Sequence, residues 1–196
     1  DDLRKVKDLL NDVKKDREFS FFIEHLTVKI RISAIELNVG DVGGTYDSGE
    51  LYAPWVLYDG IQYRMYYSCY DGGSFIHGIA LATSNDGVIW SKVARVITSD
   101  QSYDQNGAYN PCVIKDDSAP APSRYKMWYK GDGTANDTCI AYAISSDGNT
   151  WSKQGSVLPD DEGGGGPWDW KIYSCSVLKD EAEANPNYRY KMWYVG

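Results

Sequence analysis

The stretch RYKMWYKGDG at residues 124–133 recurs as YRYKMWYVG at residues 188–196 and, more loosely, as QYRMYYSCYDG at residues 62–72. Tyr, Trp and Met in such close alternation favour a β-strand, on which neighbouring side chains point to opposite faces. The recurrence predicts that the same strand occurs three times in the chain. It places Met65, Met127 and Met192 on a face packed between neighbouring units, with the Tyr and Trp side chains on the other face.

Further motifs recur in the same order around these strands. In each copy, an aromatic residue followed by Asp precedes a short strand that ends with charged residues. In the first two copies, another strand, a tight turn and a strand that begins with Trp follow. The short strands read APWVLYDG (53–60), NPCVIKDD (110–117) and SCSVLKDE (174–181), and the later segments read GIALATSNDGVIWSK (78–92) and CIAYAISSDGNTWSK (139–153). Each complete copy therefore contains about four strands, the number typical of one blade of a β-propeller.

The Ser-x-Asp-Gly turn of each complete copy has the chemistry of a tight hairpin. Gly87 and Gly148 can adopt a positive φ, and Asp86 and Asp147 can accept hydrogen bonds from the turn backbone. We interpret this motif as architectural. The Trp three residues after each Gly is expected to wedge between neighbouring blades.

The composition narrows the class of protein. Of 196 residues, 42% are hydrophobic and 24% charged, as in an ordinary soluble globular protein, and the formal net charge is −8. That charge argues against a nucleic-acid partner, since binding phosphates needs clustered Lys and Arg. The sequence has no run of about 18 apolar residues, so no membrane partner is expected. The compartment is left open, with an extracellular or periplasmic location favoured over a cytoplasmic one.

The four cysteines are Cys69, Cys112, Cys139 and Cys175, and none belongs to a CxxC pair. They fall inside predicted strands. We therefore expect buried free thiols in preference to disulfides or a zinc site.

The first 40 residues differ from the rest of the chain. Leu3, Val6, Leu10 and Val13 lie on one face of a predicted helix, and residues 28–33 alternate apolar and polar side chains as a strand does. We predict an N-terminal helix and strand segment at residues 1–40 and a partial propeller at residues 41–196, with blade units 41–100, 101–160 and 161–196.

Three aspartates follow the aromatic residue of each copy at nearly constant spacing. From Asp47, Asp104 and Asp169 to the matching Val of the next strand the distances are 9, 9 and 8 residues. The innermost strand of each blade lines the channel of a propeller, so the three carboxylates are expected at one end of it. When carboxylates converge, repulsion between like charges raises the pKa of one of them. That carboxyl group can then donate a proton while another stays ionised and acts as the base. The alternative is that each Asp caps its loop by accepting backbone hydrogen bonds.

The segments YDSGELYAPWVLYDG (46–60), YRMYYSCYDG (63–72), IALATSNDGVIWSK (79–92) and YKMWYKG (125–131) resemble the repeats of five-bladed propeller glycosidases. These are glycoside hydrolase families 43 and 32 and their relatives, and the resemblance covers roughly residues 41–196. It implies an all-β fold, a five-bladed β-propeller of which this chain holds about two and a half blades beside an N-terminal α-helix. It also implies hydrolysis of a glycosidic bond by three acidic side chains.

Carried over by position, the resemblance makes Asp47 the base or nucleophile and Asp104 the partner that tunes its pKa. Asp169 stands where the family has the general acid, usually Glu, so the chain departs from the family there. The candidates for sugar stacking, with blade packing as the alternative, are Trp55, Tyr109, Trp168 and Trp170. We predict no cofactor and no metal ligands, with a structural cation left open because some members of the family hold one near a channel His.

These patterns favour two functions. The first is a glycoside hydrolase-like propeller that acts on a polysaccharide or oligosaccharide through channel-lining carboxylates. The alternative is a non-catalytic carbohydrate-binding or scaffold propeller that assembles as a dimer. Because the repeats amount to two and a half blades, the chain is expected to be a fragment of a longer protein, to close a ring as a homodimer, or to complete its last blade with the N-terminal strands.

Overall fold

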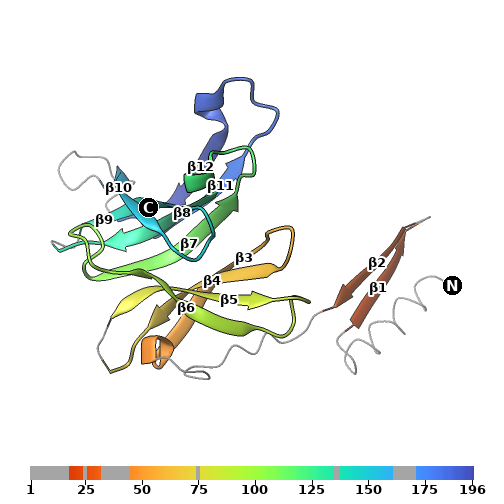
Figure 1. Cartoon of the computed structure of the whole chain (residues 1–196), viewed down its shortest axis with the longest axis horizontal. Coiled ribbons are helices and arrows are strands. Elements are labelled where there is room, and N and C mark those ends of the chain that lie inside the picture. The colour runs from red at the N-terminus through yellow and green to blue at the C-terminus, as the bar shows by residue number, and fades with distance from the viewer. Residues whose placement is uncertain (1–17, 24–25, 32–44, 74–75, 135–136, 161–170) are drawn as a thin grey trace. The chain divides into compact units, whose positions relative to one another are not determined.

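The computed structural model describes residues 18–23, 26–31, 45–73, 76–134, 137–160 and 171–196 (Figure 1). Tertiary contacts divide the chain into two units, Asp1–Glu36 and Leu37–Gly196. The first unit contains an antiparallel hairpin of β1 (Glu18–Ile23) and β2 (Leu26–Arg31). The expected N-terminal helix and the expected boundary near residue 40 lie outside the described residues.

The second unit is built from antiparallel sheets, two with four strands and one with two. Aromatic and β-branched side chains at alternating positions favour these strands because such side chains pack well on a pleated surface. The strands of the first sheet are β3 (Glu50–Tyr58), β4 (Tyr63–Tyr70), β5 (His77–Ser84) and β6 (Ser91–Thr98). Those of the second are β7 (Gly107–Lys115), β8 (Tyr125–Asp132), β9 (Thr138–Ser145) and β10 (Ser152–Pro159). The two-stranded sheet consists of β11 (Ser174–Lys179) and β12 (Tyr190–Val195).

Each four-stranded sheet is a simple meander, in which consecutive strands are neighbours. The first strands of the three sheets lie together, since β7 contacts both β3 and β11 (Figure 1). Short 3₁₀ turns precede β3 (Thr45–Asp47), β8 (Ala121–Ser123) and β12 (Pro186–Tyr188). This is the arrangement of successive propeller blades, whose first strands face a common axis.

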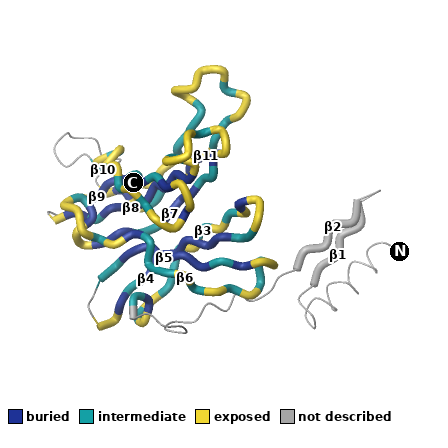
Figure 2. Tube along the Cα trace, viewed as in Figure 1, coloured by how far each residue is buried: buried dark blue, intermediate teal, exposed yellow. Residues whose placement is uncertain are grey.

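The core lies between the sheets, and Figure 2 shows β4, β5, β8 and β9 as their most buried strands. Met127 packs in one cluster with Tyr66 of the first sheet, and Met192 packs against a second cluster that contains Trp128. Met65 and Tyr66 belong to different clusters, as predicted for neighbouring residues of a strand. The prediction that every Tyr lies on the face opposite Met is wrong, because Tyr67 packs with Met65 and Tyr129 packs with Met127. Residues two positions apart on a strand share a face.

The Ser-x-Asp-Gly turns form as predicted. The Ser145 hydroxyl accepts a hydrogen bond from the Gly148 amide at 2.8 Å, and Gly148 has a φ of 73°. The Asp147 carboxylate accepts hydrogen bonds from the amides of Asn149 and Thr150, at 2.8 Å each. The turn before β6 has the same pattern, with Gly87 at a φ of 75°.

All four cysteines are free thiols, three of them buried, as predicted. Among the helices in the described part of the chain, none is long and apolar enough to cross a membrane.

Candidate functional site

Asp47, the first predicted catalytic residue, ends the 3₁₀ turn before β3 and has an exposed fraction of 1%. The Tyr67 hydroxyl on β4 donates a hydrogen bond to Asp47 Oδ2 at 3.1 Å. Lys92 Nζ on β6 is 2.7 Å from the same oxygen, and the Lys92 side chain is 3% exposed. The carboxylate is therefore held by the second and fourth strands of its own sheet.

Asp104 repeats this arrangement in the second sheet and is fully buried. Its Oδ2 accepts a hydrogen bond from the Tyr129 hydroxyl at 2.9 Å and pairs with Lys153 Nζ at 2.6 Å. Its Oδ1 accepts hydrogen bonds from the amides of Asp100 at 3.1 Å and Gln101 at 2.9 Å.

Both carboxylates thus have a lysine as counter-ion and a tyrosine as hydrogen-bond donor. Burial, and after it the nearby Asp charge, raises the pKa of Tyr67 and of Tyr129, so both hydroxyls stay protonated donors. The catalytic role of Asp47 and Asp104 stays a prediction. The backbone hydrogen bonds that Asp104 accepts match the alternative interpretation, in which the recurring Asp caps its loop.

The third predicted carboxylate, Asp169, lies outside the described residues, as do the stacking candidates Trp168 and Trp170. Tyr194 on β12 holds the position that Tyr67 and Tyr129 hold in the other sheets.

Trp55 lies at the joint between the first two sheets. Its Nε1 donates a hydrogen bond to the carbonyl oxygen of Val113 at 2.8 Å, and its ring packs against the clusters on both sides of β7. Of the two uses weighed for Trp55, these contacts favour blade packing.

Tyr109, in contrast, belongs to a group of rings at the start of the first strands. The rings of Tyr52 and Tyr109 stack with centroids 6.4 Å apart and planes 26° apart. His77 lies 5.1 Å from Tyr109 and stacks on Tyr70 at 4.5 Å. Together with Tyr173, which immediately precedes β11 and is 52% exposed, we call these five residues the aromatic shelf.

Charged side chains border the aromatic shelf. Lys130 Nζ lies 5.2 Å from the ring centroid of Tyr109 and 5.7 Å from that of Tyr173, so it links the second and third sheets. Asp132, also on β8, has its Oδ2 at 3.8 Å from Lys130 Nζ. Glu50, which is exposed, pairs in register with Tyr70 of the shelf.

His77 supplies a neutral polar atom within the shelf. Burial lowers its pKa, although the charges of Glu50 and Asp132 act in the opposite direction. Among the described residues, its buried Nδ1 has no hydrogen-bond partner. The imidazole is therefore uncharged at neutral pH.

β-Bulges in β3 and β7 set the direction of the Tyr52 and Tyr109 side chains. The register of β3 against β4 shifts after Tyr52, and that of β7 against β8 shifts after Tyr109. The next residues, Ala53 and Asn110, have positive φ values of 49° and 51°. Such bulges redirect a side chain, and they are common next to functional sites. Asn110 also donates from Nδ2 to the carbonyl oxygen of Tyr173 at 2.6 Å, which fixes the third tyrosine against the second sheet.

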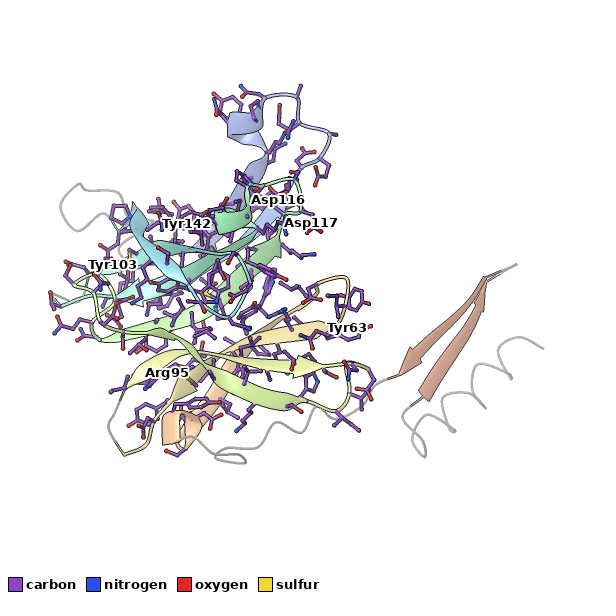
Figure 3. All side chains as sticks on the ribbon, in the orientation of Figure 1. Tyr63, Arg95, Tyr103, Asp116, Asp117 and Tyr142 are labelled. Carbon is purple, nitrogen blue, oxygen red and sulfur yellow. The ribbon has the colours of Figure 1, made fainter. Side chains whose placement is uncertain are left out.

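Sequence reasoning singled out Tyr109 but missed Tyr52, Tyr70 and Tyr173. One signal was available, because Tyr52, Tyr109 and Tyr173 stand at the same place relative to the three aligned short strands. Within the described ranges, no group of three or more His, Cys, Asp or Glu residues could hold a metal ion. Figure 3 shows the described side chains, with Tyr103 marking the loop that carries Asp104.

Comparison with known proteins adds two findings, and no family model matches the chain. Over 124 residues the chain is 36% identical to an uncharacterized protein of Mycobacterium tuberculosis strain CDC 1551 / Oshkosh, and 35% identical to one of strain H37Rv. Each match covers 58% of this chain and 39% of the relative. The chain therefore spans about two fifths of the length of these curated relatives.

Solved structures resemble the chain over about three quarters of its length. A family 117 glycoside hydrolase from Zobellia galactanivorans has a TM-score of 0.58 and 14% identity, covering 76% of this chain and 50% of that one. A glycosyl hydrolase from Bacteroides ovatus has a TM-score of 0.57 and 21% identity, covering 76% and 44%. These likenesses show the fold, which is the all-β propeller of glycosidases, as predicted. Membership of families 43 or 32 stays a prediction.

Proposed function

We propose that this chain forms the carbohydrate-binding face of a glycosidase-type propeller, with the aromatic shelf as the place where a sugar stacks. The observation that carries the proposal is the gathering of Tyr52, Tyr109 and Tyr173 from three successive first strands. The C–H face of a pyranose packs on an aromatic ring, and polar groups at the edge then fix its hydroxyls. Tyr109 is restrained for this task, since its ring lies over Gly107, where a Cβ would come within 2.0 Å of the Tyr109 hydroxyl.

The neighbouring proteins support the same ligand class. Those named above are described as glycoside hydrolases, and another solved neighbour is described as belonging to a family with hydrolases that target β-1,2 mannosidic linkages. The fold alone does not decide function, so the proposal depends on the shelf.

Binding to a glycan array, followed by titration of the best glycan, tests the proposal. Tyr109→Ala should weaken binding at least about tenfold, which corresponds to about 1.4 kcal/mol. Tyr58→Ala is the matched control, since Tyr58 is 58% exposed at the other end of β3 and should leave binding unchanged. No binding to any glycan, or equal loss in the two variants, would contradict the proposal.

Hydrolysis is the second candidate. Glu50 and Asp132 support it, because both carboxylates act on His77 of the shelf and a glycosidase needs two carboxyl groups across the scissile bond. If the wild type releases reducing sugar and both Glu50→Gln and Asp132→Asn abolish that release, Glu50 and Asp132 are favoured as the catalytic carboxyl groups. Loss in Asp47→Asn with the fold intact would instead favour the carboxylates predicted from the sequence.

Closure of a ring by two chains stays a prediction. Leu178 and Trp193 on β11 and β12 are 57% and 59% exposed, so apolar surface is available there for a second copy. Light scattering would support the homodimer with a mass of twice the 22.0 kDa chain, and a monomer would contradict it.

A further inference from the structure

The ammonium group of Lys130, which borders the aromatic shelf, has few polar partners among the described residues. Its side chain is only 16% exposed, and its carboxylate partner, Asp132, is 3.8 Å away, beyond hydrogen-bonding distance. Within the described residues, no hydrogen bond from Lys130 Nζ is found, although an ammonium group has three donors.

Three other lysines of the same sheets are held much more tightly by carboxylates. Nζ of Lys92, Lys153 and Lys179 lies 2.7, 2.6 and 2.8 Å from a carboxylate oxygen. Lys130 instead faces two tyrosine rings, which attract a cation but accept no conventional hydrogen bond. Its donors therefore have no acceptor within hydrogen-bonding distance among the described residues, and a carboxylate bound beside the two rings would supply one.

We propose that the aromatic shelf recognises a uronic acid residue, whose ring stacks on Tyr109 or Tyr173 while its carboxylate pairs with Lys130. The inference rests on the proposed carbohydrate-binding function. A carboxylate forms a short, charge-assisted hydrogen bond with an ammonium, about twice as strong as a bond between neutral groups. A neutral sugar could offer Lys130 only hydroxyl oxygens.

The surroundings also limit how much charge the ligand carries. Glu50 and Asp132 border the shelf, and the chain has a formal net charge of −8. A second carboxylate close to the first would be repelled by these groups. The shelf therefore suits a single uronate within a chain of neutral sugars in preference to a continuous polyuronate.

Matched pairs of oligosaccharides test the inference directly. Each pair contains one oligosaccharide with a single uronate, such as glucuronate-substituted xylotetraose, and its carboxyl-reduced form, with glucuronate, galacturonate and mannuronate represented. Calorimetry on the full chain should give at least about tenfold tighter binding of one acidic member, and the preference should shrink as salt rises.

Variants of Lys130 separate charge recognition from stacking. Lys130→Met should abolish the preference while leaving the reduced form bound, and Lys130→Arg should retain it. Lys191→Met is the control. Lys191 lies near the start of β12 and pairs with Asp180, whereas the end of β12 lies beside the first residue of β11, next to Tyr173 of the shelf. Near-ultraviolet circular dichroism establishes that each variant is folded.

The outcomes distinguish this inference from the proposed function. Equal binding of the two members of every pair, or tighter binding of the reduced form, would overturn uronate recognition while the carbohydrate site stands. A preference that survives in Lys130→Met would overturn the role of Lys130. Failure to bind any glycan, acidic or neutral, would overturn the proposed function itself.

Discussion

The hydroxyl of Tyr66 on β4 donates a hydrogen bond to the carbonyl oxygen of Gly148 at 2.9 Å, across the joint between the two four-stranded sheets. The ring of Tyr66 also meets Trp151 edge-on, with centroids 5.8 Å apart. The turn before β10 therefore packs against β4, the second strand of the first sheet. Trp151, which follows this turn, lies between the two sheets, as expected from the sequence.

Gly148→Ala should destabilise the protein for two reasons, backbone strain at a positive φ and a steric clash of the added Cβ. Its φ is 73°, and an added Cβ would lie 2.7 Å from the Tyr66 hydroxyl. Gly155→Ala is the control, since Gly155 has a φ of 107° but nothing within 4 Å of the added Cβ. We expect a loss of about 1–3 kcal/mol for Gly155→Ala and a clearly larger loss for Gly148→Ala in urea unfolding. Equal losses would show that the joint tolerates the methyl group.

Asp116→Asn should weaken the joint between β7 and the β11–β12 pair. The Asp116 carboxylate, labelled in Figure 3, accepts hydrogen bonds from Lys179 Nζ at 2.8 Å, Ser118 Oγ at 2.6 Å and the Tyr190 hydroxyl. We expect a loss of about 2 kcal/mol at pH 7, as for hydrogen bonds to a charged group. Asp117→Asn, whose side chain is 73% exposed, should change the free energy of unfolding by less than about 0.5 kcal/mol.

The same carboxylate should make stability depend on acid pH. Burial raises the pKa of Asp116, but the hydrogen bonds from Lys179, Ser118 and Tyr190 together outweigh burial and hold the pKa below its ordinary value. The folded-state pKa is thus below the unfolded value of about 3.9, so the contribution to stability is complete above about pH 5 and declines as the pH falls further. Urea unfolding between pH 5 and 3 should show a shallower decline for Asp116→Asn than for the wild type. A parallel decline would contradict this assignment.

Asp104→Asn tests whether the buried carboxylate is structural. Removing its charge would leave Lys153 facing a neutral amide, and breaking a buried ion pair costs about 3 kcal/mol or more. Asp100→Asn also touches Lys153, but Asp100 is 57% exposed, so we expect a loss below about 1 kcal/mol. If Asp104 is instead catalytic, the asparagine variant should keep its thermal stability and lose hydrolysis.

His77 should add a second pH dependence closer to neutrality. Because burial lowers its pKa, the unfolded state binds a proton more readily, and stability falls as the pH drops below about 6.5. The wild type should therefore lose more stability than His77→Gln between pH 7 and 5. An NMR titration that places the pKa of His77 at or above 6.5 would contradict this prediction.

Much of the fold could be predicted because local patterns recur. The alternation around Met65, Met127 and Met192 identified the second strand of each sheet, and the Ser-x-Asp-Gly motif located the turn before the fourth. These features depend on side chains close together in the sequence, where strand periodicity and turn chemistry act directly.

The site could be predicted only in part, because it depends on register between distant strands. Asp104 and Lys153 are 49 residues apart, and no local pattern reveals that they pair. The aromatic shelf depends on bulges at Ala53 and Asn110, and the sequence around these two residues does not indicate a positive φ. The sequence therefore leaves the recurring Asp open between chemistry and loop capping, and of the recurring tyrosines it indicates only Tyr109.

The ties from Asp47 to Lys92 and from Asp104 to Lys153 connect the loop before the innermost strand with the outermost strand. In each of these two sheets an ion pair thus joins the two edges. The outer strand cannot fray without separating its lysine from the buried Asp carboxylate on the inner side. The amide protons of β6 and β10 that are hydrogen-bonded to β5 and β9 should then exchange with solvent at nearly the rate of the central strands, and each of these sheets should open as one cooperative folding unit.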